Sequence, residues 1–523
     1  MNERNTNKHA VIVGAGPAGL TAACLLLREI PDIQITVIEA TDRVGGIAAT
    51  IAYKGNRMDM GGHRFFTKSL QVKEFWEAFL PVQGQPAKDD LLLNEQKNYS
   101  FNGPDPETTD SVMLIRNRVS RIFFSGNFFD YPVSIRLSTF ANLGLWNTCK
   151  AGFSYLYALI KKRKVHSLED FYINRFGKQL YRMFFEEYTE KIWGIHPSNL
   201  SSSWGAQRVK SLSIRNILKE AVTKIFHPQY ESKHISLIER FLYPKLGPGQ
   251  LWAMVANEIK ASGGTLRLNA RVVKINLMDQ VVKTISIETN GKSETLPVDY
   301  LFSTMPVKDL ALAIESRIPA EIKQIASQLK YRDFITVGLL VKKLKLKNQT
   351  KIKTLENIIP DCWIYIQDRE VKIGRIQIFN NWSPYMVHDY RQTVWIGLEY
   401  FCDEGDEMWN MPKEDFIEFA IAELVKIKII DRDAVIDAHQ EKVLKAYPAY
   451  FGAHYEFDKV KGYLDTIENL YCLGRNGQHK YNNMDHSMLT AFEAVKVFKS
   501  GQKDKSSIWN VNTADGYHET INN

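Results

Sequence analysis

The 523-residue chain is long enough for roughly two to four structural units, and its 45% hydrophobic content is ordinary for a folded protein with a large core. A net charge of +8 is mild over this length, and no arginine-rich block with interleaved aromatic residues occurs, so nothing indicates a nucleic-acid partner. The five cysteines are scattered without a C-x-x-C pair, which favours reduced thiols in a cytoplasmic protein and argues against a metal site.

Membrane-directed segments are not expected. The first nine residues are polar and lead directly into an apolar strand, which leaves no room for a signal peptide. Residues 137–160 come nearest to the roughly 18–20 apolar residues that a membrane helix needs. Asn142, Asn147 and Lys150 interrupt this segment, so no transmembrane span is predicted, and peripheral membrane contact there stays open as a secondary alternative. The basic run at 161–164 is interpreted as a solvated helix end.

A dinucleotide-binding pattern lies near the N-terminus. Residues 10–13 are apolar and predict a buried strand, and residues 17–27 predict a helix. Gly14, Gly16 and Gly19 have the G-x-G-x-x-G spacing. In this motif the first glycine permits a tight turn, the second lets the backbone approach a pyrophosphate, and the third lets the helix pack on the strand. The helix start offers N–H groups and a positive dipole end to the phosphates.

The next segment distinguishes a flavin from a nicotinamide cofactor. A second strand at 33–38 is followed by Glu39, which can accept hydrogen bonds from a ribose and disfavours a 2′-phosphate there. Arg43, Gly45 and Gly46 come next, and the planar fork of an arginine suits a diphosphate. This pattern resembles the E-x-x-x-R-x-G-G segment of the two-domain FAD oxidoreductases, which include amine oxidases, protoporphyrinogen oxidases and phytoene desaturases. The resemblance implies that the arginine and glycines contact the FAD diphosphate and ribityl chain.

The same resemblance assigns two further cofactor contacts. Gly61 and Gly62 would lie beside the isoalloxazine ring, where missing side chains let the backbone reach it. His63 follows directly and is given a positional role. A strand near Val272 would lie beside the adenine.

A third cofactor segment is expected near the C-terminus. Residues 471–475 predict a strand and a glycine turn, and residues 488–498 predict a helix for which Asp485 or Ser487 fits the N-cap. The resemblance places this helix start at the pyrimidine side of the flavin, where a positive dipole end favours the anionic reduced form. The cofactor residues predicted here are Gly474, Arg475, Asn483, Met484, Asp485 and Ser487.

The predicted fold class is α/β, with a Rossmann-like FAD-binding domain that is discontinuous in sequence, a helical domain and an antiparallel-sheet substrate domain. Residues 82–110 are polar and rich in proline, glycine and asparagine, which predicts a mobile loop. The expected units are the FAD-binding domain at 1–70, 236–306 and 461–500, a mainly helical substrate or lid domain at 71–235, a sheet-rich substrate-binding domain at 307–460 and a polar tail at 501–523.

The substrate half resembles the UDP-galactopyranose mutases, particularly the eukaryotic type, on several spaced residues. Tyr365 stands ten residues before Arg375, Tyr447 precedes a proline, and Tyr481 stands six residues after Arg475. In that family the matching residues surround the substrate diphosphate, and the second arginine lies near the sugar and the flavin. Arginines neutralise the charge of a diphosphate while hydroxyl groups donate hydrogen bonds to it.

The mutase resemblance extends to further residues of the helical region. It implies that Trp193 and Phe66 face the sugar, although core packing stays an alternative for both. It also implies that Tyr131 lies near the nucleotide and that Arg208 closes over the diphosphate on a mobile flap. Two positions depart from the mutase pattern, with Thr189 in place of an asparagine and Ser134 in place of a glutamine, and leave the sugar and the base open.

The resemblance implies a nucleotide-sugar mutase, an isomerase of polysaccharide biosynthesis that interconverts pyranose and furanose forms through attack of reduced flavin N5 on the anomeric carbon. The substrate would be a nucleotide-diphosphate sugar, NADPH or NADH would be the external reductant, and homo-oligomers are common in that family. Two alternatives stay open: an FAD-dependent oxidase of the amine oxidase or protoporphyrinogen oxidase type, and a flavin-bearing binding protein.

Overall fold

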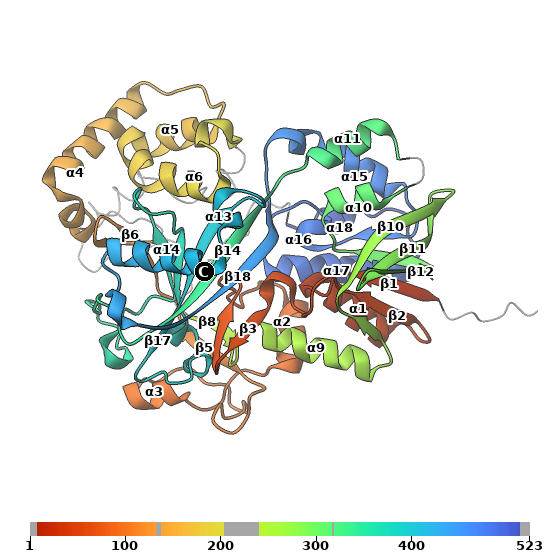
Figure 1. Cartoon of the computed structure of the whole chain (residues 1–523), viewed down its shortest axis with the longest axis horizontal. Coiled ribbons are helices and arrows are strands. Elements are labelled where there is room, and N and C mark those ends of the chain that lie inside the picture. The colour runs from red at the N-terminus through yellow and green to blue at the C-terminus, as the bar shows by residue number, and fades with distance from the viewer. Residues whose placement is uncertain (1–7, 132–136, 203–239, 316–317, 513–523) are drawn as a thin grey trace, which may run out of the picture.

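The computed structural model describes residues 8–131, 137–202, 240–315 and 318–512 (Figure 1). Two halves lie side by side. One contains a parallel sheet with its helices, and the other contains a larger, mostly antiparallel sheet with a helical layer at its outer side. The predicted α/β multi-domain fold is confirmed.

The parallel sheet carries the N-terminal motif at its centre. Its strands run in the order β19-β13-β1-β2-β9, and all neighbouring pairs are parallel. Ala10 and Ile12 point to one hydrophobic core, while Val11 and Val13 point to another, as strand alternation requires. The strands are β1 (His9–Val13), β2 (Gln34–Ile38), β9 (Thr265–Arg267), β13 (Tyr300–Ser303) and β19 (Leu470–Cys472).

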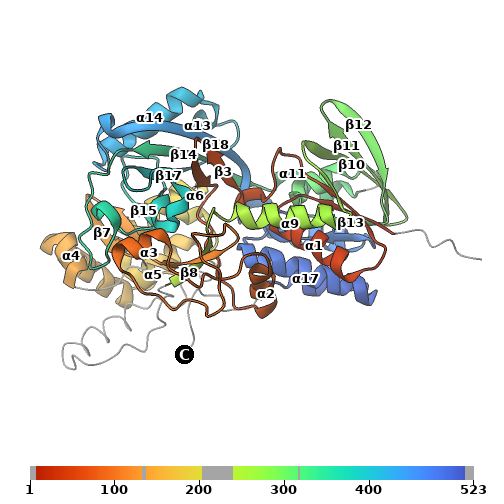
Figure 2. The same ribbon diagram turned by 90° about the horizontal axis from the view of Figure 1, so that it is seen from below.

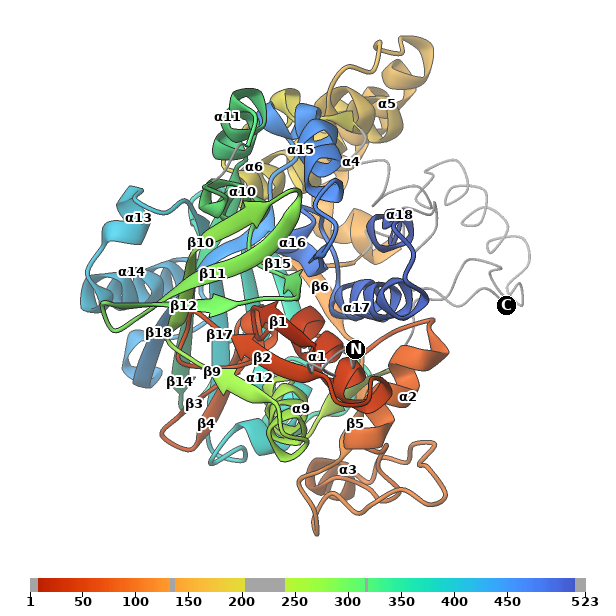
Figure 3. The ribbon, with the colours of Figure 1, turned by 90° about the vertical axis from the view of Figure 1, so that its right-hand side faces the viewer.

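Both faces of this sheet are covered, which makes it a Rossmann-like layer structure. Helices from distant parts of the sequence pack together on one face (Figures 2 and 3): α1 (Pro17–Glu29), α2 (Leu70–Phe79), α9 (Gly249–Ala261) and α17 (Met484–Ser500). A small antiparallel sheet and three helices cover the other face: β10 (Ala270–Met278), β11 (Val281–Thr289), β12 (Lys292–Pro297), α10 (Val307–Ala313), α11 (Ala320–Gln328) and α15 (Phe457–Asp465).

The second half is built on a seven-stranded sheet in the order β18-β14-β17-β16-β15-β6-β7. Only the β15–β6 pair is parallel. The strands are β6 (Ser120–Phe124), β7 (Asn127–Asp130), β14 (Tyr331–Val341), β15 (Trp363–Ile366), β16 (Arg375–Ile378), β17 (Val394–Cys402) and β18 (Val435–Pro448). Helix α14 (Lys413–Lys426) packs on its hydrophobic face.

The described part of the region predicted to be mainly helical, 71–235, contains strands as well as helices. Strands β6 and β7 form a hairpin whose turn residues, Ser125 and Gly126, have φ angles of +50° and +77°. Strand β5 (Met113–Asn117) pairs with β8 (Arg240–Pro244). The phenylalanine-rich alternation before and after Ser125-Gly126 was the missed signal.

The helical layer of this half consists of α4 (Leu137–Ile160), α5 (Leu168–Tyr181), a π-helical turn (Arg182–Glu186) and α6 (Glu187–Trp193). Gly144 and Gly177 have φ angles of +76° and +78°, which kink α4 and α5. Shorter elements are β3 (Thr50–Tyr53), β4 (Asn56–Asp59), α12 (Phe379–Trp382), α13 (Glu407–Asn410) and α16 (Gly474–Gly477).

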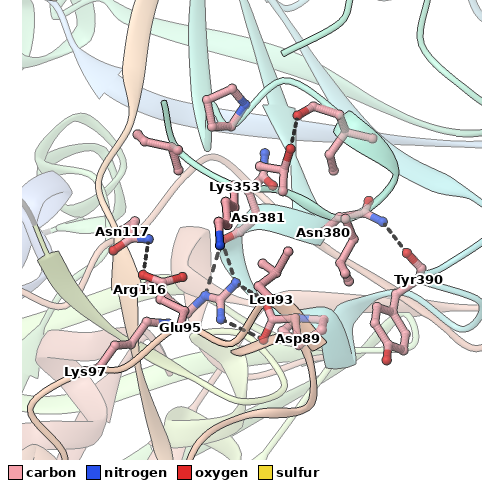
Figure 4. Close-up of a pocket in the computed structure, with 16 residues that line it drawn as sticks. Asp89, Leu93, Glu95, Lys97, Arg116, Asn117, Lys353, Asn380, Asn381 and Tyr390 are labelled. Atoms are coloured by element: carbon pink, nitrogen blue, oxygen red, sulfur yellow. Dashed lines mark hydrogen bonds and ion pairs between the residues drawn. The ribbon is translucent and has the colours of Figure 1, made fainter. Parts of the chain in front are cut away.

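Residues 82–110, which were predicted to be a mobile loop, have little regular secondary structure but pack around buried charges. They include α3 (Lys88–Leu93), where Asp89 accepts two hydrogen bonds from Arg116 (Figure 4). Burial would raise the pKa of Asp89, but the guanidinium outweighs it and lowers that pKa. Asp90 forms a buried ion pair with Lys97. The adjoining cavity is about 50 Å³, which is room for water rather than for a substrate.

Part of the segment expected to be a polar tail, 501–523, packs on the fold. Helix α18 (Ser506–Trp509) buries Ile508 and Trp509, and the Trp509 indole donates a 2.7 Å hydrogen bond to Asp465. Because the segment is mostly polar, its composition did not indicate that Ile508 and Trp509 would be buried.

Candidate active site

A cavity of about 580 Å³ lies where the turn after β1, the end of β2, β18 and the start of α17 meet. This volume is typical of cofactor and substrate pockets. Its lining includes the predicted residues Gly14, Gly16, Glu39, Arg43, Gly46, His63, Val272, Gly474, Arg475, Asn483, Met484 and Ser487. Five other predicted cofactor residues do not line it: Gly19, Gly45, Gly61, Gly62 and Asp485.

Two of the three glycines of the first turn, Gly14 and Gly19, are required by close packing. Gly14 has a φ of +100°, and a Cβ there would overlap the Thr304 hydroxyl. A Cβ at Gly19 would overlap the carbonyl oxygen of Gly14, so the third glycine acts in helix packing rather than at the cavity wall. Gly16 faces Gly46, with 3.8 Å from its added Cβ to the Gly46 Cα. The cavity floor at the α1 N-terminus is therefore backbone.

Two charged residues border this floor. The Glu39 carboxylate accepts the backbone N–H groups of Ala15 at 2.8 Å and Thr41 at 2.9 Å, which ties the turn to the end of β2. Arg43 contacts Glu441 of β18 at 3.4 Å. The arginine therefore connects the two halves across the cavity.

The start of α17 differs from the sequence prediction. The N-cap is Asn483, whose backbone N–H donates to Nδ1 of His486 at 3.2 Å. Asp485 and Ser487 lie inside the first turn, so the prediction that one of them is the cap was wrong. Met484 is buried in the core below α1 and extends the apolar face one turn earlier than residues 488–498 suggested.

His63 lies at the side of the cavity nearest the substrate half. Its Nδ1 is 2.8 Å from the Gly61 carbonyl oxygen. Desolvation and then the nearby Arg475 charge lower the pKa of His63 to about 4, so the ring is neutral at pH 7. The preceding Gly62 packs under Trp363, whose ring a Cβ would overlap. This glycine pair therefore joins the substrate sheet to the cavity.

Arg375 is the centre of a buried polar network. Its Nε donates to the Tyr188 hydroxyl at 2.7 Å, and its Nη1 donates to Glu399 at 3.1 Å and to the Tyr447 hydroxyl at 3.4 Å. Glu399 pairs directly with Arg375 in the β16–β17 register and also accepts from Gln377 at 3.0 Å. Burial raises the pKa of Glu399, against the opposing effect of Arg375. The charge of Arg375 is thus largely offset.

Arg475 lies at the junction of this network and the cavity. Its guanidinium donates to the carbonyl oxygens of Asn482 and Ala446, both at 2.9 Å. It also lies over the rings of Tyr447 and Tyr481, with 5.3 Å and 4.9 Å to their centroids. The two tyrosines stack at 5.9 Å. The described hydrogen-bond partners of Arg475 are neutral, so its charge is available to an anion.

The remaining predicted substrate residues do not form a single group. Tyr365 stacks on Tyr131 at 4.3 Å, so the structure brings these two together. Trp193 is buried in a hydrophobic cluster that includes Tyr447. Phe66 is half-buried, and its predicted role stays a prediction. Arg208 and Ser134 lie outside the described residues.

Comparison with known proteins identifies the family. A model described as flavin containing amine oxidoreductase matches residues 17–460. The chain belongs to this family. It is therefore a flavoenzyme of the amine oxidase superfamily, and the family implies FAD as the cofactor.

Relatives within and around this family differ in activity. An L-amino-acid oxidase of Crotalus adamanteus is 35% identical over 126 residues, which are 24% of this chain and 21% of that protein. A phytoene desaturase of Phycomyces blakesleeanus is 27% identical over 165 residues, 31% of this chain and 27% of that protein. The chain thus spans about a quarter of the length of these relatives. Reduced UDP-galactopyranose mutase is similar in structure, with a TM-score of 0.76, 19% identity and 97% of each chain covered, which shows the fold.

Sequence reasoning missed the residues that hold Arg375. Glu399 is the single charged residue of the buried strand β17, and that isolation was the available signal. Tyr188 lay inside a segment singled out for Trp193 and gave no separate signal. Within the described residues no helix is long and apolar enough to cross a membrane, and no group of three or more His, Cys, Asp or Glu side chains is arranged for a metal ion.

Proposed function

We propose that this flavoenzyme is an FAD-dependent nucleotide-sugar mutase similar to UDP-galactopyranose mutase. The observation that carries the proposal is the arginine–tyrosine network of Arg375, Tyr447, Tyr481 and Arg475 directly beside the cavity. An oxidase that acts on an amine or a porphyrinogen does not need this concentration of hydroxyl and guanidinium donors. The likeness to reduced UDP-galactopyranose mutase over 97% of the chain supports the same proposal.

The cavity fits FAD on the evidence of its own residues. The Cβ-free turn at Gly14 and Gly16 brings backbone N–H groups to the place where a diphosphate would bind, and Arg43 lies opposite. Val272 would flank the adenine, and the Asn483 end of α17 would face the flavin ring. Bound and reduced, FAD would supply a nucleophilic nitrogen for the anomeric carbon of the sugar.

The side chains of the substrate half would hold the nucleoside diphosphate when it leaves and returns. Arg475 supplies the cation, because Arg375 is paired with Glu399. Arg375 instead orients the Tyr447 hydroxyl, and Tyr447, Tyr481 and Tyr365 would donate hydrogen bonds to phosphate oxygens. His63, neutral at pH 7, adds no second positive charge beside Arg475.

The second candidate is an oxidase, favoured by the 35% identity to an L-amino-acid oxidase. Incubation of the dithionite-reduced and oxidised holoenzyme with UDP-galactopyranose separates the two. Product analysis by chromatography should show a furanose product with the reduced enzyme alone. Steady hydrogen peroxide formation from an amino acid, amine or porphyrinogen, without any isomerisation, would exclude the mutase.

The residue assignment has its own test. Tyr481→Phe removes one hydroxyl from the network, and we expect about tenfold lower kcat/KM, as for loss of one hydrogen bond to a charged group. Tyr455→Phe, on an exposed residue outside the network, is the matched control and should behave as the wild type. Anaerobic reduction by NADPH and by NADH, followed by flavin absorbance, would identify the reductant.

A further inference from the structure

Helix α4 exposes large apolar side chains to solvent, whereas a helix at a protein surface normally exposes polar ones. Among its described side chains, at 143–160, α4 buries only Leu143, Ala151 and Ala158. The side chains it exposes are large, with Trp146, Phe153, Tyr157 and Ile160 between 62% and 87% exposed. The exposed set recurs at intervals of seven, four and three residues, so it forms one continuous stripe. Exposed apolar surface of this extent marks an interaction site.

The buried face holds α4 in place. A Cβ at Gly177 of α5 would overlap the backbone at Ser154 and Tyr155, which shows how closely the two helices approach. The Ser154 hydroxyl also accepts the backbone N–H of Gln179 at 3.0 Å. The stripe therefore cannot turn inward without breaking the α4–α5 contact. Figure 1 shows α4 at the outer edge of the molecule, beyond α5.

The charged residues of α4 and of the segment directly after it, up to residue 168, are all basic. The sequence contains no aspartate or glutamate between Asp130 and Glu169. Lys150 lies over the Trp146 ring at 4.6 Å, and Lys161, Lys162 and Lys164 follow the helix end and are exposed. The charge of Arg163 is partly offset, because its guanidinium contacts Asp170 at 3.5 Å. Large apolar and aromatic side chains bordered by lysines are the composition of helices that lie in the headgroup region of an anionic bilayer.

We propose that α4 docks this protein onto an anionic lipid surface. The helix lies in the plane of the membrane, with Trp146, Phe153, Tyr157 and Ile160 inserted among the headgroups and the lysines against lipid phosphates. It does not span the bilayer, because its opposite face is packed on α5. The buried face of α4 packs on the substrate half, since Leu143 lies in the same cluster as Phe184 and Tyr365.

Cys149 provides a site-specific probe. It lies on the exposed face of α4, and the other four cysteines are buried, so a maleimide dye would label it selectively. We expect an emission shift and flotation of the protein with vesicles of phosphatidylcholine and phosphatidylglycerol, and neither with phosphatidylcholine alone. Phe153→Gln with Ile160→Gln, and separately Lys161→Glu with Lys162→Glu, should each weaken binding roughly tenfold or more.

The control for charge is Lys342→Glu with Lys343→Glu, an exposed lysine pair directly after β14 that should leave vesicle binding unchanged. Far-ultraviolet circular dichroism verifies that each variant is folded. No shift with either vesicle would overturn the proposal. A shift that follows protein concentration without vesicles would also overturn it, because the stripe would then be covered by a second copy of the chain.

Discussion

The cofactor cavity and the substrate network are constructed in different ways. The cavity floor is backbone, brought close by Gly14, Gly16 and Gly19, whereas the network is made of side chains held by Arg375 and Glu399. A missing side chain leaves a local mark in the sequence, but a side-chain pair formed across two strands leaves none. The sequence therefore predicts the cofactor cavity in detail, whereas it predicts the substrate network only through resemblance to a known family. Four substitutions test this contrast.

The largest effect is expected where the network loses its counter-charge. Glu399→Gln leaves the buried Arg375 guanidinium without its carboxylate, and breaking a buried pair costs about 3–5 kcal/mol. Urea denaturation of the holoenzyme measures this change in the free energy of unfolding. Asp431→Asn removes the exposed partner of Lys345 and should cost about 0–1 kcal/mol. Equal effects of the two variants would mean that Arg375 is not dependent on Glu399.

A methyl group added at Gly19, where α1 packs behind the cavity floor, should lower the free energy of unfolding almost as much. Gly19→Ala forces a Cβ against the Gly14 carbonyl oxygen, so we expect about 2–3 kcal/mol of destabilisation and loss of bound FAD. Flavin absorbance per protein and the melting temperature report both. Gly462→Ala adds its Cβ to open space in α15 and should be neutral or slightly stabilising. Retention of FAD in Gly19→Ala would refute the close-packing argument.

His63 lies between the two regions and should give a pH-dependent effect. Its pKa is lowered to about 4 in the folded protein from an ordinary value of 6.5. Between pH 4 and pH 6.5 the unfolded chain therefore binds a proton at His63 more readily than the folded protein does. Stability should fall as pH drops from 6.5 to 4, with His63 contributing at most about 1.4 kcal/mol per pH unit. In His63→Gln the slope of unfolding free energy against pH should be shallower over that window. An unchanged slope would show that the ring does not titrate as expected.

The smallest effect is expected at the contact between the halves. Arg43 and Glu441 are both partly exposed, so Glu441→Gln should change stability by no more than about 1 kcal/mol. The same change removes a carboxylate from the cavity wall and from Arg43, and we expect FAD to bind up to about fivefold tighter. Titration of the apoprotein with FAD measures this. Weaker binding would mean that Glu441 itself supports the cofactor.

The sequence predicted features that depend on neighbouring residues and missed those that depend on contacts between distant segments. The strands near Gly14 and Glu39 and the helix after Asn483 were predicted within a few residues, because glycine spacing and apolar runs are local. The hairpin at Ser125 was missed, because its two short strands complete a sheet whose other members follow more than two hundred residues later. The buried pairs of Asp89 and Arg116 were missed, because polar composition resembles a loop until the partners are known.

The position of β19 has a consequence for how the protein is made. Strand β13 lies between β1 and β19, and α17 packs beside α1, so the first and last parts of the chain complete one sheet and one cavity. Synthesis at roughly 5–20 residues per second leaves the glycine turn waiting about half a minute or longer for residues 470–500. Until then the ribosome-bound chain lacks the edge strand β19 and helix α17, and its cofactor site is incomplete. Because Asn483, Met484 and Ser487 line the cavity, we expect flavin to bind only after this segment has been synthesised.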